Sequence, residues 1–161
     1  MKKVLVLGAG LVSKPLVEYL LEKRISILVA SPMKERADEM IGGNPLGRSV
    51  YWSMDDTLTL TRMISEHDVI VSLLPFRFHA EVAKLCVDIG KHLVTTSYVN
   101  PEMMALDTEA RKKGVLLLNE IGLDPGIDHM SAMKIIDHVH GNGGSIEKFF
   151  SLCGALPAPE A

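Results

Sequence analysis

Residues 3–15 read KVLVLGAGLVSKP, and this stretch decides the fold that we expect for the chain. The apolar run Val4–Leu7 is typical of a strand buried on both faces. Gly8 and Gly10 interrupt the run, and apolar residues then recur at helical spacing. These apolar residues are Val12, Leu16, Tyr19 and Leu20. The stretch therefore predicts a strand, a glycine turn and a helix in direct succession.

The glycine turn predicts an anion-binding site. A strand that opens directly into a helix aims unpaired backbone N–H groups at one spot, where the helix dipole adds partial positive charge. Gly8 allows the sharp turn, and Gly10 has no Cβ to keep a phosphate away from the backbone. Ser13 replaces the third small residue of the G-x-G-x-x-G/A pattern. Taken alone, the turn fits a dinucleotide site about as well as a methyltransferase loop or another α/β glycine turn.

Length, charge and hydropathy narrow the class of protein. The 161 residues suffice for one domain with a core, or for one domain and a fragment of a second. The formal net charge of −3 gives no electrostatic reason to expect nucleic acid or an anionic membrane as a partner. No apolar run is long enough to predict a membrane span, and no signal peptide is visible. We therefore expect a cytoplasmic protein that acts on a small molecule.

The chain contains two cysteines, Cys86 and Cys153, and both lie inside apolar patterns. We interpret both as reduced, buried thiols, in preference to a disulfide or a catalytic thiol. Together with the scattered histidines they do not form a zinc-binding pattern, so no metal is expected.

The rest of the chain alternates strands and helices. Further apolar runs predict strands at residues 25–30, 49–52, 69–74, 93–96 and 115–118. Between them, helices are predicted at residues 31–40, 55–66, 79–89 and 100–114. The signals are Ser31 as N-cap with Pro32 as first residue, a cap at Asp55-Asp56, Gly90 as left-handed end, and Asn100 as cap before Pro101. Six strands joined by helical crossovers predict an α/β doubly wound parallel sheet, the Rossmann fold, with strand order 3-2-1-4-5-6.

The end of the second strand bears on the choice of cofactor. An acidic residue there would bind the ribose 2′-hydroxyl and favour NAD, but the strand ends in Ala30 and Ser31. Ser31 can hydrogen-bond a hydroxyl or a phosphate, and Lys34 and Arg36 can neutralise a 2′-phosphate. We therefore expect NAD or NADP with a lean towards NADP. The competing interpretation, that Lys34 and Arg36 are solvated charges on a helix face, has equal weight.

Two strand ends lie beside the point where the strand order reverses, which is where such sheets bind ligands. We expect Leu74 and Pro75, after the fourth strand, to approach a nicotinamide ring. Residues 95–98 (TTSY), after the fifth strand, put hydroxyls at the mouth of the crevice. These hydroxyls can bind an amino-acid-like substrate. Ordinary strand-end capping is the alternative for each of them.

The segment after the sixth strand offers further polar groups. Asp124 precedes the tight turn Pro125-Gly126 and has no helix to cap, which favours a functional role. Asp128 is expected to cap a helix that runs to about His140. His129 is either a proton carrier or an ordinary first-turn residue, and the periodicity does not decide between them.

The pattern changes after the glycine-rich residues 141–144. Residues 145–153 (SIEKFFSLC) alternate as a strand would. We expect this strand to begin a second domain that has been cut off. The predicted division is therefore a Rossmann domain at residues 1–144 and the start of a substrate or dimerisation domain at residues 145–161.

Several blocks of sequence resemble the glutamate-forming saccharopine dehydrogenases (saccharopine reductases). They are LNEIGLDPGIDHM at 118–130, VSLLP at 71–75, VTTSYV at 94–99 and LCGALPAPE at 152–160. The resemblance covers essentially the whole chain, and these blocks are far more specific than the glycine turn.

The resemblance implies a nicotinamide-dependent oxidoreductase of lysine metabolism that acts on a CH–NH bond. Such enzymes interconvert saccharopine and NAD(P)⁺ with glutamate, 2-aminoadipate 6-semialdehyde and NAD(P)H, through an imine. By resemblance, Ser97, Tyr98 and Asp124 lie at the substrate crevice, and Tyr98 and Asp124 are the catalytic candidates. Leu11 and Val12 join the two glycines of the dinucleotide turn, and Leu74 and Pro75 lie near the nicotinamide.

The chain departs from the family at Pro32, Phe76, Arg77 and Ala155. It also lacks the region that supplies basic groups for the substrate carboxylates, so we expect this chain to bind a dinucleotide but to turn over saccharopine slowly or not at all. A homodimer would form through that region. The alternatives are a carboxynorspermidine or homospermidine type of reductive condensation enzyme and a non-catalytic dinucleotide-binding module.

Overall fold

The computed structural model describes residues 2–154 and contains one parallel sheet of six strands. The strand order is β3-β2-β1-β4-β5-β6, which confirms the predicted doubly wound topology. The strands are β1 (Lys3–Leu7), β2 (Ser26–Ser31), β3 (Gly47–Tyr51), β4 (Val69–Ser72), β5 (His92–Thr95) and β6 (Leu117–Leu118). Each predicted strand of this sheet is present within two residues of its expected bounds.

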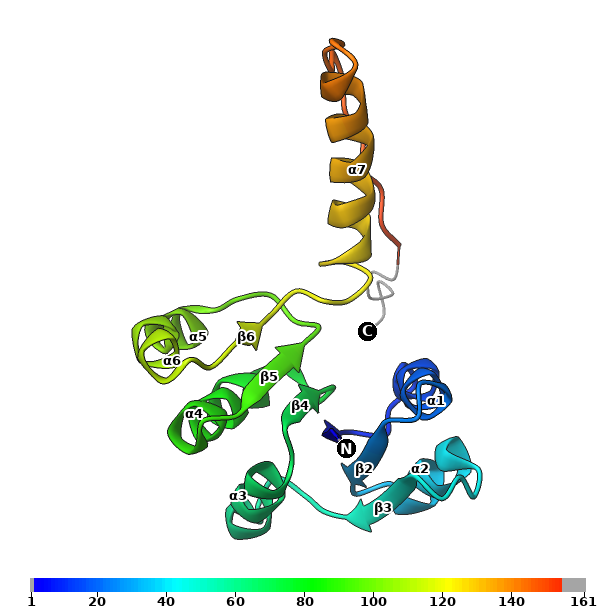
Figure 1. The fold of residues 1–161 in the computed structure, drawn as a ribbon, viewed down its shortest axis with the longest axis vertical. Coiled ribbons are helices and arrows are strands. Elements are labelled where there is room, and N and C mark those ends of the chain that lie inside the picture. Colours follow the sequence, from blue (N-terminus) through cyan, green and yellow to red (C-terminus); the bar gives the residue numbers. More distant parts are fainter. Residues whose placement is uncertain (1, 155–161) are drawn as a thin grey trace, which may run out of the picture.

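Helices lie on both faces of the sheet (Figure 1). One face carries α1 (Ser13–Glu22) and α2 (Lys34–Ile41), and the other carries α3 (Thr57–Glu66), α4 (His79–Ile89), α5 (Pro101–Ala105) and α6 (Asp107–Lys113). A short 3₁₀ helix, η1 (Phe76–Phe78), precedes α4. Right-handed crossovers explain the two layers, because the chain reverses its direction across the sheet between β3 and β4.

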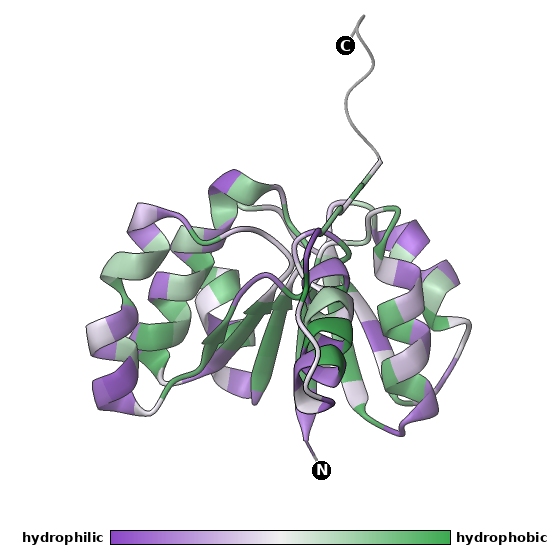
Figure 2. Cartoon of the chain, turned by 90° about the horizontal axis from the view of Figure 1, so that it is seen from above, coloured by the Kyte–Doolittle hydropathy of each residue, from purple (hydrophilic) through white to green (hydrophobic). Residues whose placement is uncertain are grey.

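The central strand β1 is apolar on both faces because it is covered on both. Val6 pairs with Val29 of β2 and with Val71 of β4, all in parallel register. Leu5, Val6 and Leu7 are fully buried. Figure 2 shows the apolar strands between helices whose outer sides are polar. A continuous apolar run is the expected pattern for such a strand.

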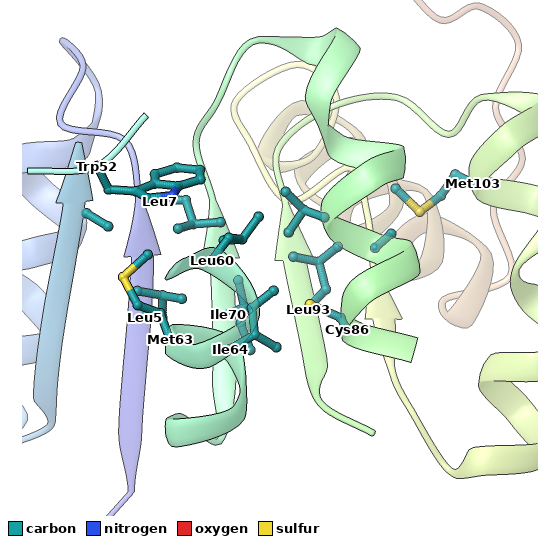
Figure 3. Close-up of a cluster of buried hydrophobic side chains, with 13 residues drawn as sticks. Leu5, Leu7, Trp52, Leu60, Met63, Ile64, Ile70, Cys86, Leu93 and Met103 are labelled. Atoms are coloured by element: carbon teal, nitrogen blue, oxygen red, sulfur yellow. The ribbon is translucent and has the colours of Figure 1, made fainter. Parts of the chain in front are cut away.

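One core cluster lies between the sheet and the helices α3 and α4 (Figure 3). Leu5 and Leu7 of β1 and Ile70 of β4 pack there against Leu60 and against Trp52, which follows β3. A second cluster fills the space between the other face and α1 and α2. Both clusters meet at β1, so the glycine turn that follows β1 has a rigid support.

The buried face of α1 differs from the predicted one. The residues that face the sheet are Ser13, Val17 and Leu21, whereas Val12 and Tyr19 are 71% and 56% exposed. Ser13 can be buried because its Oγ donates a hydrogen bond of 3.0 Å to the carbonyl of Gly8. Val12 precedes the helix, which frees it to border the space beside the glycine turn.

The second helix begins at Lys34, so the prediction of Ser31 as its N-cap and Pro32 as its first residue is wrong. Ser31 is the last residue of β2 and pairs with Tyr51 of β3. Its Oγ accepts a hydrogen bond of 3.0 Å from the N–H of Met33. Pairing with β3 therefore extends the strand by one residue, and the serine hydroxyl closes the turn before the helix.

Most predicted helix signals are present. Asp56 caps α3 by accepting from the N–H of Thr59 at 2.9 Å, and Gly90 ends α4 in the left-handed conformation. Asn100 caps α5 by accepting from the N–H of Met103 at 2.7 Å. The single helix expected at residues 100–114 is instead two, because the chain breaks at Leu106 between α5 and α6.

The last helix, α7 (Ile127–Gly141), extends away from the sheet (Figure 1). None of its residues is buried. The prediction of a strand at residues 145–153 is wrong, because the chain there runs back beside α7 without forming a strand. Phe149 and Ser151 line a hollow together with Met133 and Ile136 of α7. Alternation alone does not make a strand, since a strand needs a partner to accept its hydrogen bonds. Residues 155–161, which carry part of the family resemblance, lie outside the described residues.

The two cysteines differ in environment. Cys86 is fully buried in α4, as predicted, and burial raises the pKa of its thiol to about 12. Cys153 is exposed, so the prediction of a second buried thiol is wrong. Its thiol lies within hydrogen-bonding distance of the Asp124 carboxylate, and this contact raises the pKa of Cys153 above its usual value. Within residues 2–154, none of the helices has both the length and the apolar character needed to cross a membrane.

Candidate functional site

The turn after β1 requires glycine at its first position. Gly8 has a φ of +106°, and a Cβ built on it would lie 3.0 Å from the carbonyl oxygen of Leu73 at the end of β4. Its N–H donates to the carbonyl of Ala30 at 2.9 Å, which ties the turn to β2. A side chain here would be strained and would press on the neighbouring strand.

The surroundings of Gly10, in contrast, are open. No described atom lies within 4 Å of a Cβ built at this position, so the space above the backbone is open. Among residues 2–154, no backbone carbonyl accepts a hydrogen bond from the N–H groups of Gly10, Leu11 or Val12. These donors lie just before the N-terminus of α1, where the helix dipole favours an anion. Open backbone and free amides fit the pyrophosphate of a dinucleotide.

A cavity of about 470 Å³ adjoins the turn. It brings together five of the residues predicted for cofactor binding: Gly8, Gly10, Ser31, Leu74 and Pro75. Its volume is in the range that suits a small-molecule site. Its wall also contains residues that we did not predict as cofactor contacts: Trp52, Ser53, Met54 and Asp55 after β3, and Arg77 and Phe78 after β4. The signal that would have found them is their position just beyond the carboxyl ends of parallel strands.

Two of the residues predicted to contact the cofactor are engaged in contacts within the chain. Lys34 does not line this cavity, and its Nζ lies 2.6 Å from Oδ2 of Asp38, one turn further along α2. Ser31 lines the cavity but is only 1% exposed, and its hydroxyl already accepts from the N–H of Met33. Lys34 and Ser31 are therefore held by contacts within the chain, and Arg36, the third residue expected to meet a 2′-phosphate, does not line this cavity.

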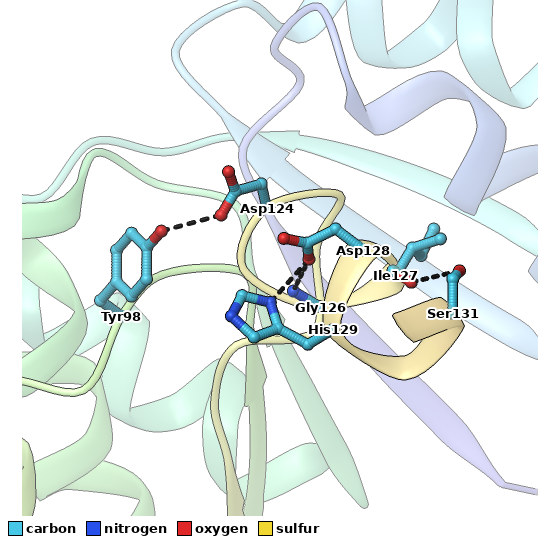
Figure 4. Close-up of polar contacts among 7 residues, drawn as sticks. All are labelled: Tyr98, Asp124, Gly126, Ile127, Asp128, His129 and Ser131. Atoms are coloured by element: carbon cyan, nitrogen blue, oxygen red, sulfur yellow. Dashed lines mark hydrogen bonds and ion pairs between the residues drawn. The ribbon is translucent and has the colours of Figure 1, made fainter. Parts of the chain in front are cut away.

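The second group of predicted residues lies above the carboxyl end of β5 (Figure 4). The phenol of Tyr98 donates a hydrogen bond of 2.8 Å to Oδ1 of Asp124. This hydrogen bond raises the pKa of Tyr98 above its usual value of 10.0. Tyr98 therefore keeps its proton at neutral pH, and Asp124 is the acceptor of the pair.

Backbone hydrogen bonds bring these two residues together. The N–H of Ile121 donates to the carbonyl of Thr95 at 3.2 Å, and the N–H of Glu120 donates to the carbonyl of Ser97 at 3.1 Å. The carboxylate of Glu120 accepts from the N–H of Val99 at 3.1 Å. The segment after β6 is thus bound to the segment after β5, which fixes Asp124 over Tyr98.

The start of α7 holds the remaining polar groups. Gly126 has a φ of +146° and lies so close to Gly122 that a Cβ would overlap its backbone. Asp128 stands in the first turn, with Gly126 at the N-cap, and its Oδ1 accepts from the N–H of Gly126 at 3.0 Å. Asp128 therefore satisfies a backbone donor at the helix start, as predicted, although from a position inside the helix.

His129 contacts the same carboxylate. Its Nδ1 lies 2.7 Å from Oδ1 of Asp128, and this hydrogen bond raises the pKa of His129 above 6.5. Because the folded pKa is above the unfolded value, the pair stabilises the fold fully below the unfolded pKa. That contribution is lost as the pH rises through the folded pKa.

We expect an NMR titration of the His129 ring to give a pKa above 6.5. In the Asp128→Asn variant the pKa should fall, because the neutral amide no longer favours the imidazolium. The Asp137→Asn variant, which removes a carboxylate from the same helix without touching the pair, should leave the pKa of His129 unchanged. A pKa at or below 6.5 in the unsubstituted chain would contradict the contact with Asp128.

A second hollow lies between the two groups of residues. This apolar groove, of about 650 Å³, is lined by Val12 and Leu16 beside the glycine turn and by Thr96 and Asp124 on the far side. Leu73 borders both hollows. Gly8 and Gly10 therefore line the first cavity and Asp124 the second, with the end of β4 as their common wall.

A parallel sheet of this order, with an open glycine turn and free amides at the end of β1, defines the dinucleotide-binding class of α/β proteins. The chain belongs to the saccharopine dehydrogenase family. Residues 4–118 match the family described as the saccharopine dehydrogenase NADP binding domain, and residues 122–161 match the saccharopine dehydrogenase C-terminal domain. The family resemblance inferred from the sequence is thereby confirmed.

Individual relatives agree with this assignment. The chain is 45% identical to the Schizosaccharomyces pombe protein named saccharopine dehydrogenase [NADP(+), L-glutamate-forming], over 99% of this chain and 36% of the relative. It is 40% identical to the Bos taurus mitochondrial alpha-aminoadipic semialdehyde synthase, over 99% of this chain and 17% of the relative. The chain thus spans about a third or less of the length of these relatives.

Solved structures of other proteins share the fold of this chain. The apo saccharopine dehydrogenase (L-Glu forming) from Saccharomyces cerevisiae superposes with a TM-score of 0.86 at 38% identity, over 99% of this chain and 36% of that one. Biliverdin reductase from Synechocystis, solved with biliverdin and NADP⁺, gives a TM-score of 0.62 at 17% identity over 87% of this chain and 42% of that one. The second likeness concerns the fold alone.

Proposed function

We propose that this chain is the cofactor-binding part of a glutamate-forming saccharopine dehydrogenase that uses NADP⁺. In the proposed reaction, saccharopine, NADP⁺ and water give glutamate, 2-aminoadipate 6-semialdehyde, NADPH and a proton. The observation that carries the proposal is the open backbone at Gly10 with its free amides, in a chain of this family. The whole reaction needs groups beyond those described, because the chain spans 36% of the S. pombe relative.

A nicotinamide in this site would supply the acceptor for the hydride on the carbon next to the secondary amine of saccharopine. The amides of Gly10, Leu11 and Val12 would hold the pyrophosphate, for which the turn offers unpaired donors. Leu74 and Pro75 wall the cavity on the side of β4 and exclude water from the ring.

Asp124 is the proposed general base. It takes the proton of the secondary amine and releases it to solvent. It later takes a proton from the water that adds to the imine carbon, and this proton passes to the amine nitrogen as the C–N bond breaks. The raised pKa of Tyr98 supports this assignment, since a protonated phenol that donates to Asp124 orients the carboxylate and does not act as a base itself. The hydroxyl of Ser97, beside Tyr98, is proposed to bind a polar group of the amino-acid substrate.

Two expectations about the wider assembly stay predictions. They are the division of the chain into residues 1–144 and 145–161, and a homodimer formed through a second domain. We also expect this chain alone to bind the dinucleotide while turning over saccharopine slowly or not at all. Tyr98 and Asp124, the two proposed catalytic residues, lie near the start of α7 (Figure 4).

Binding and turnover can be tested separately. We expect the 161-residue chain to bind NADPH, and a chimera that continues it with the remaining residues of the S. pombe relative to form NADPH from saccharopine. In the chimera, Asp124→Asn should lower the rate by about 100-fold or more, the usual contribution of general base catalysis, while NADPH still binds. A chain that binds no dinucleotide, or a chimera that prefers a polyamine-type amine to saccharopine, would contradict the proposal.

A further inference from the structure

The cavity of about 470 Å³ beside the glycine turn, called here the cofactor cavity, is lined by a guanidinium that the glycine motif does not include. Arg77 lies in η1, between the carboxyl end of β4 and α4, and it lines the same cavity as Ser31, Pro32 and Met33 at the end of β2. Among the described residues of this wall, Arg77 is the single cation and Asp55 the single carboxylate. Segments from two strand ends, about 45 residues apart in sequence, therefore meet across this cavity.

Contacts in the chain hold Arg77 and leave its charge available. Its Cζ lies 4.7 Å from the centroid of the Phe78 ring, which also lines the cavity. Stacking on an aromatic ring orients a guanidinium while its N–H donors remain free at the edge. Within residues 2–154, no carboxylate lies within ion-pair distance of Arg77.

The two basic candidates on α2, Lys34 and Arg36, do not line this cavity. Lys34 is paired with Asp38 at 2.6 Å, and that carboxylate also accepts a hydrogen bond from Ser49. Lys34 would have to leave this pair to reach a phosphate, whereas Arg77 already lines the cavity. The end of β2 itself carries no acidic side chain that would bind a ribose 2′-hydroxyl.

We propose that Arg77 determines cofactor specificity by binding the 2′-phosphate of NADP(H). This inference rests on the proposed function, because it assumes that a dinucleotide occupies the cavity. A phosphate monoester carries nearly two negative charges at neutral pH, and a guanidinium binds such a group through two parallel hydrogen bonds. NADH lacks this phosphate and is otherwise identical, so the ratio of the two affinities isolates the contact.

The test is a titration of the 161-residue chain with NADPH and with NADH, followed by the fluorescence of Trp52. This residue is the only tryptophan in the chain and lines the cavity. In Arg77→Gln, the Kd for NADPH should rise about tenfold or more, as for loss of a charge-assisted hydrogen bond, while the Kd for NADH stays within about twofold. Arg77→Lys should keep part of the preference, because it keeps the charge and loses the planar fork.

Matched variants separate the outcomes. Arg111→Gln removes a guanidinium from α6, where it pairs with Asp107 at 2.8 Å, and should change neither affinity. An equal loss of NADPH and NADH binding in Arg77→Gln would overturn the proposal, because Arg77 would then contact a group that both share. Loss of the preference for NADPH over NADH in Lys34→Ala, and not in Arg77→Gln, would also overturn the proposal. So would tighter binding of NADH than of NADPH by the unsubstituted chain, with Asp55 bound to the ribose 2′-hydroxyl. A chain that binds neither dinucleotide contradicts the proposed function as a whole.

Discussion

Replacement of Gly10 by valine is expected to weaken NADPH binding by about 100-fold or more while leaving the fold intact. The new side chain has room in the free protein, because no described atom lies within 4 Å of the Cβ position. It fills the space that the pyrophosphate needs, so the phosphate oxygens no longer reach the amides of Leu11 and Val12. Loss of two charge-assisted hydrogen bonds at about 1.5 kcal/mol each gives this factor.

Gly8→Ala is the matched variant for this prediction, and it should behave in the opposite way. The φ of +106° and the contact with Leu73 make a side chain costly, by about 1–3 kcal/mol of unfolding free energy. Urea unfolding followed by circular dichroism measures stability, and titration with NADPH measures affinity. A Gly10→Val chain that unfolds as readily as Gly8→Ala, or that binds NADPH normally, would refute the assignment of the open turn to the cofactor.

Trp52→Ala is expected to lower the free energy of unfolding by about 3–5 kcal/mol, the usual cost of truncating a buried large aromatic residue. Trp52 is 2% exposed and packs in the core cluster with Leu7 and Leu60. Its indole Nε1 donates to the carbonyl of Asp56 at 3.0 Å, just before α3. The loss is a large part of a domain stability of about 5–15 kcal/mol. Urea unfolding by circular dichroism measures it without relying on tryptophan fluorescence.

Two variants show what Trp52 contributes. Trp52→Phe keeps most of the apolar volume and loses the hydrogen bond, so it should cost much less than Trp52→Ala. Tyr51→Ala changes the preceding residue, the last of β3, which is 65% exposed, and should alter stability by less than about 0.5 kcal/mol. Equal losses in Trp52→Ala and Tyr51→Ala would mean that Trp52 does not anchor the core.

The predictions that succeeded depend on nearby residues. The cap at Asp56 and the left-handed residue Gly90 involve backbone groups only a few positions away, so the sequence shows both partners at once. The predictions that failed depend on distant partners. The strand β2 extends to Ser31 because β3 lies beside it, and residues 145–153 form no strand because no strand pairs with them in the described part of the chain.

The candidate site divides in the same way. The residues of the turn, and Leu74 and Pro75, were predictable because the ends of parallel strands gather at one edge of the sheet. Of the apolar residues predicted for α1, Leu16 and Leu20 pack against the core, whereas Val12 borders a groove and the polar Ser13 is buried by a hydrogen bond. Periodicity does not distinguish an apolar residue that lines a groove from one that lines the core.

The sequence by itself determined the succession of strands and helices, the order of the sheet, the glycine turn and the family. Only the tertiary structure decided that Arg77, and not Lys34, lines the cofactor cavity, and that Tyr98 meets Asp124 across 26 residues of chain. The physical reason is the range of the interactions. Strand and helix formation depends on the local pattern of apolar and capping residues, whereas the neighbours of a side chain in a cavity depend on how separate strand ends pack side by side.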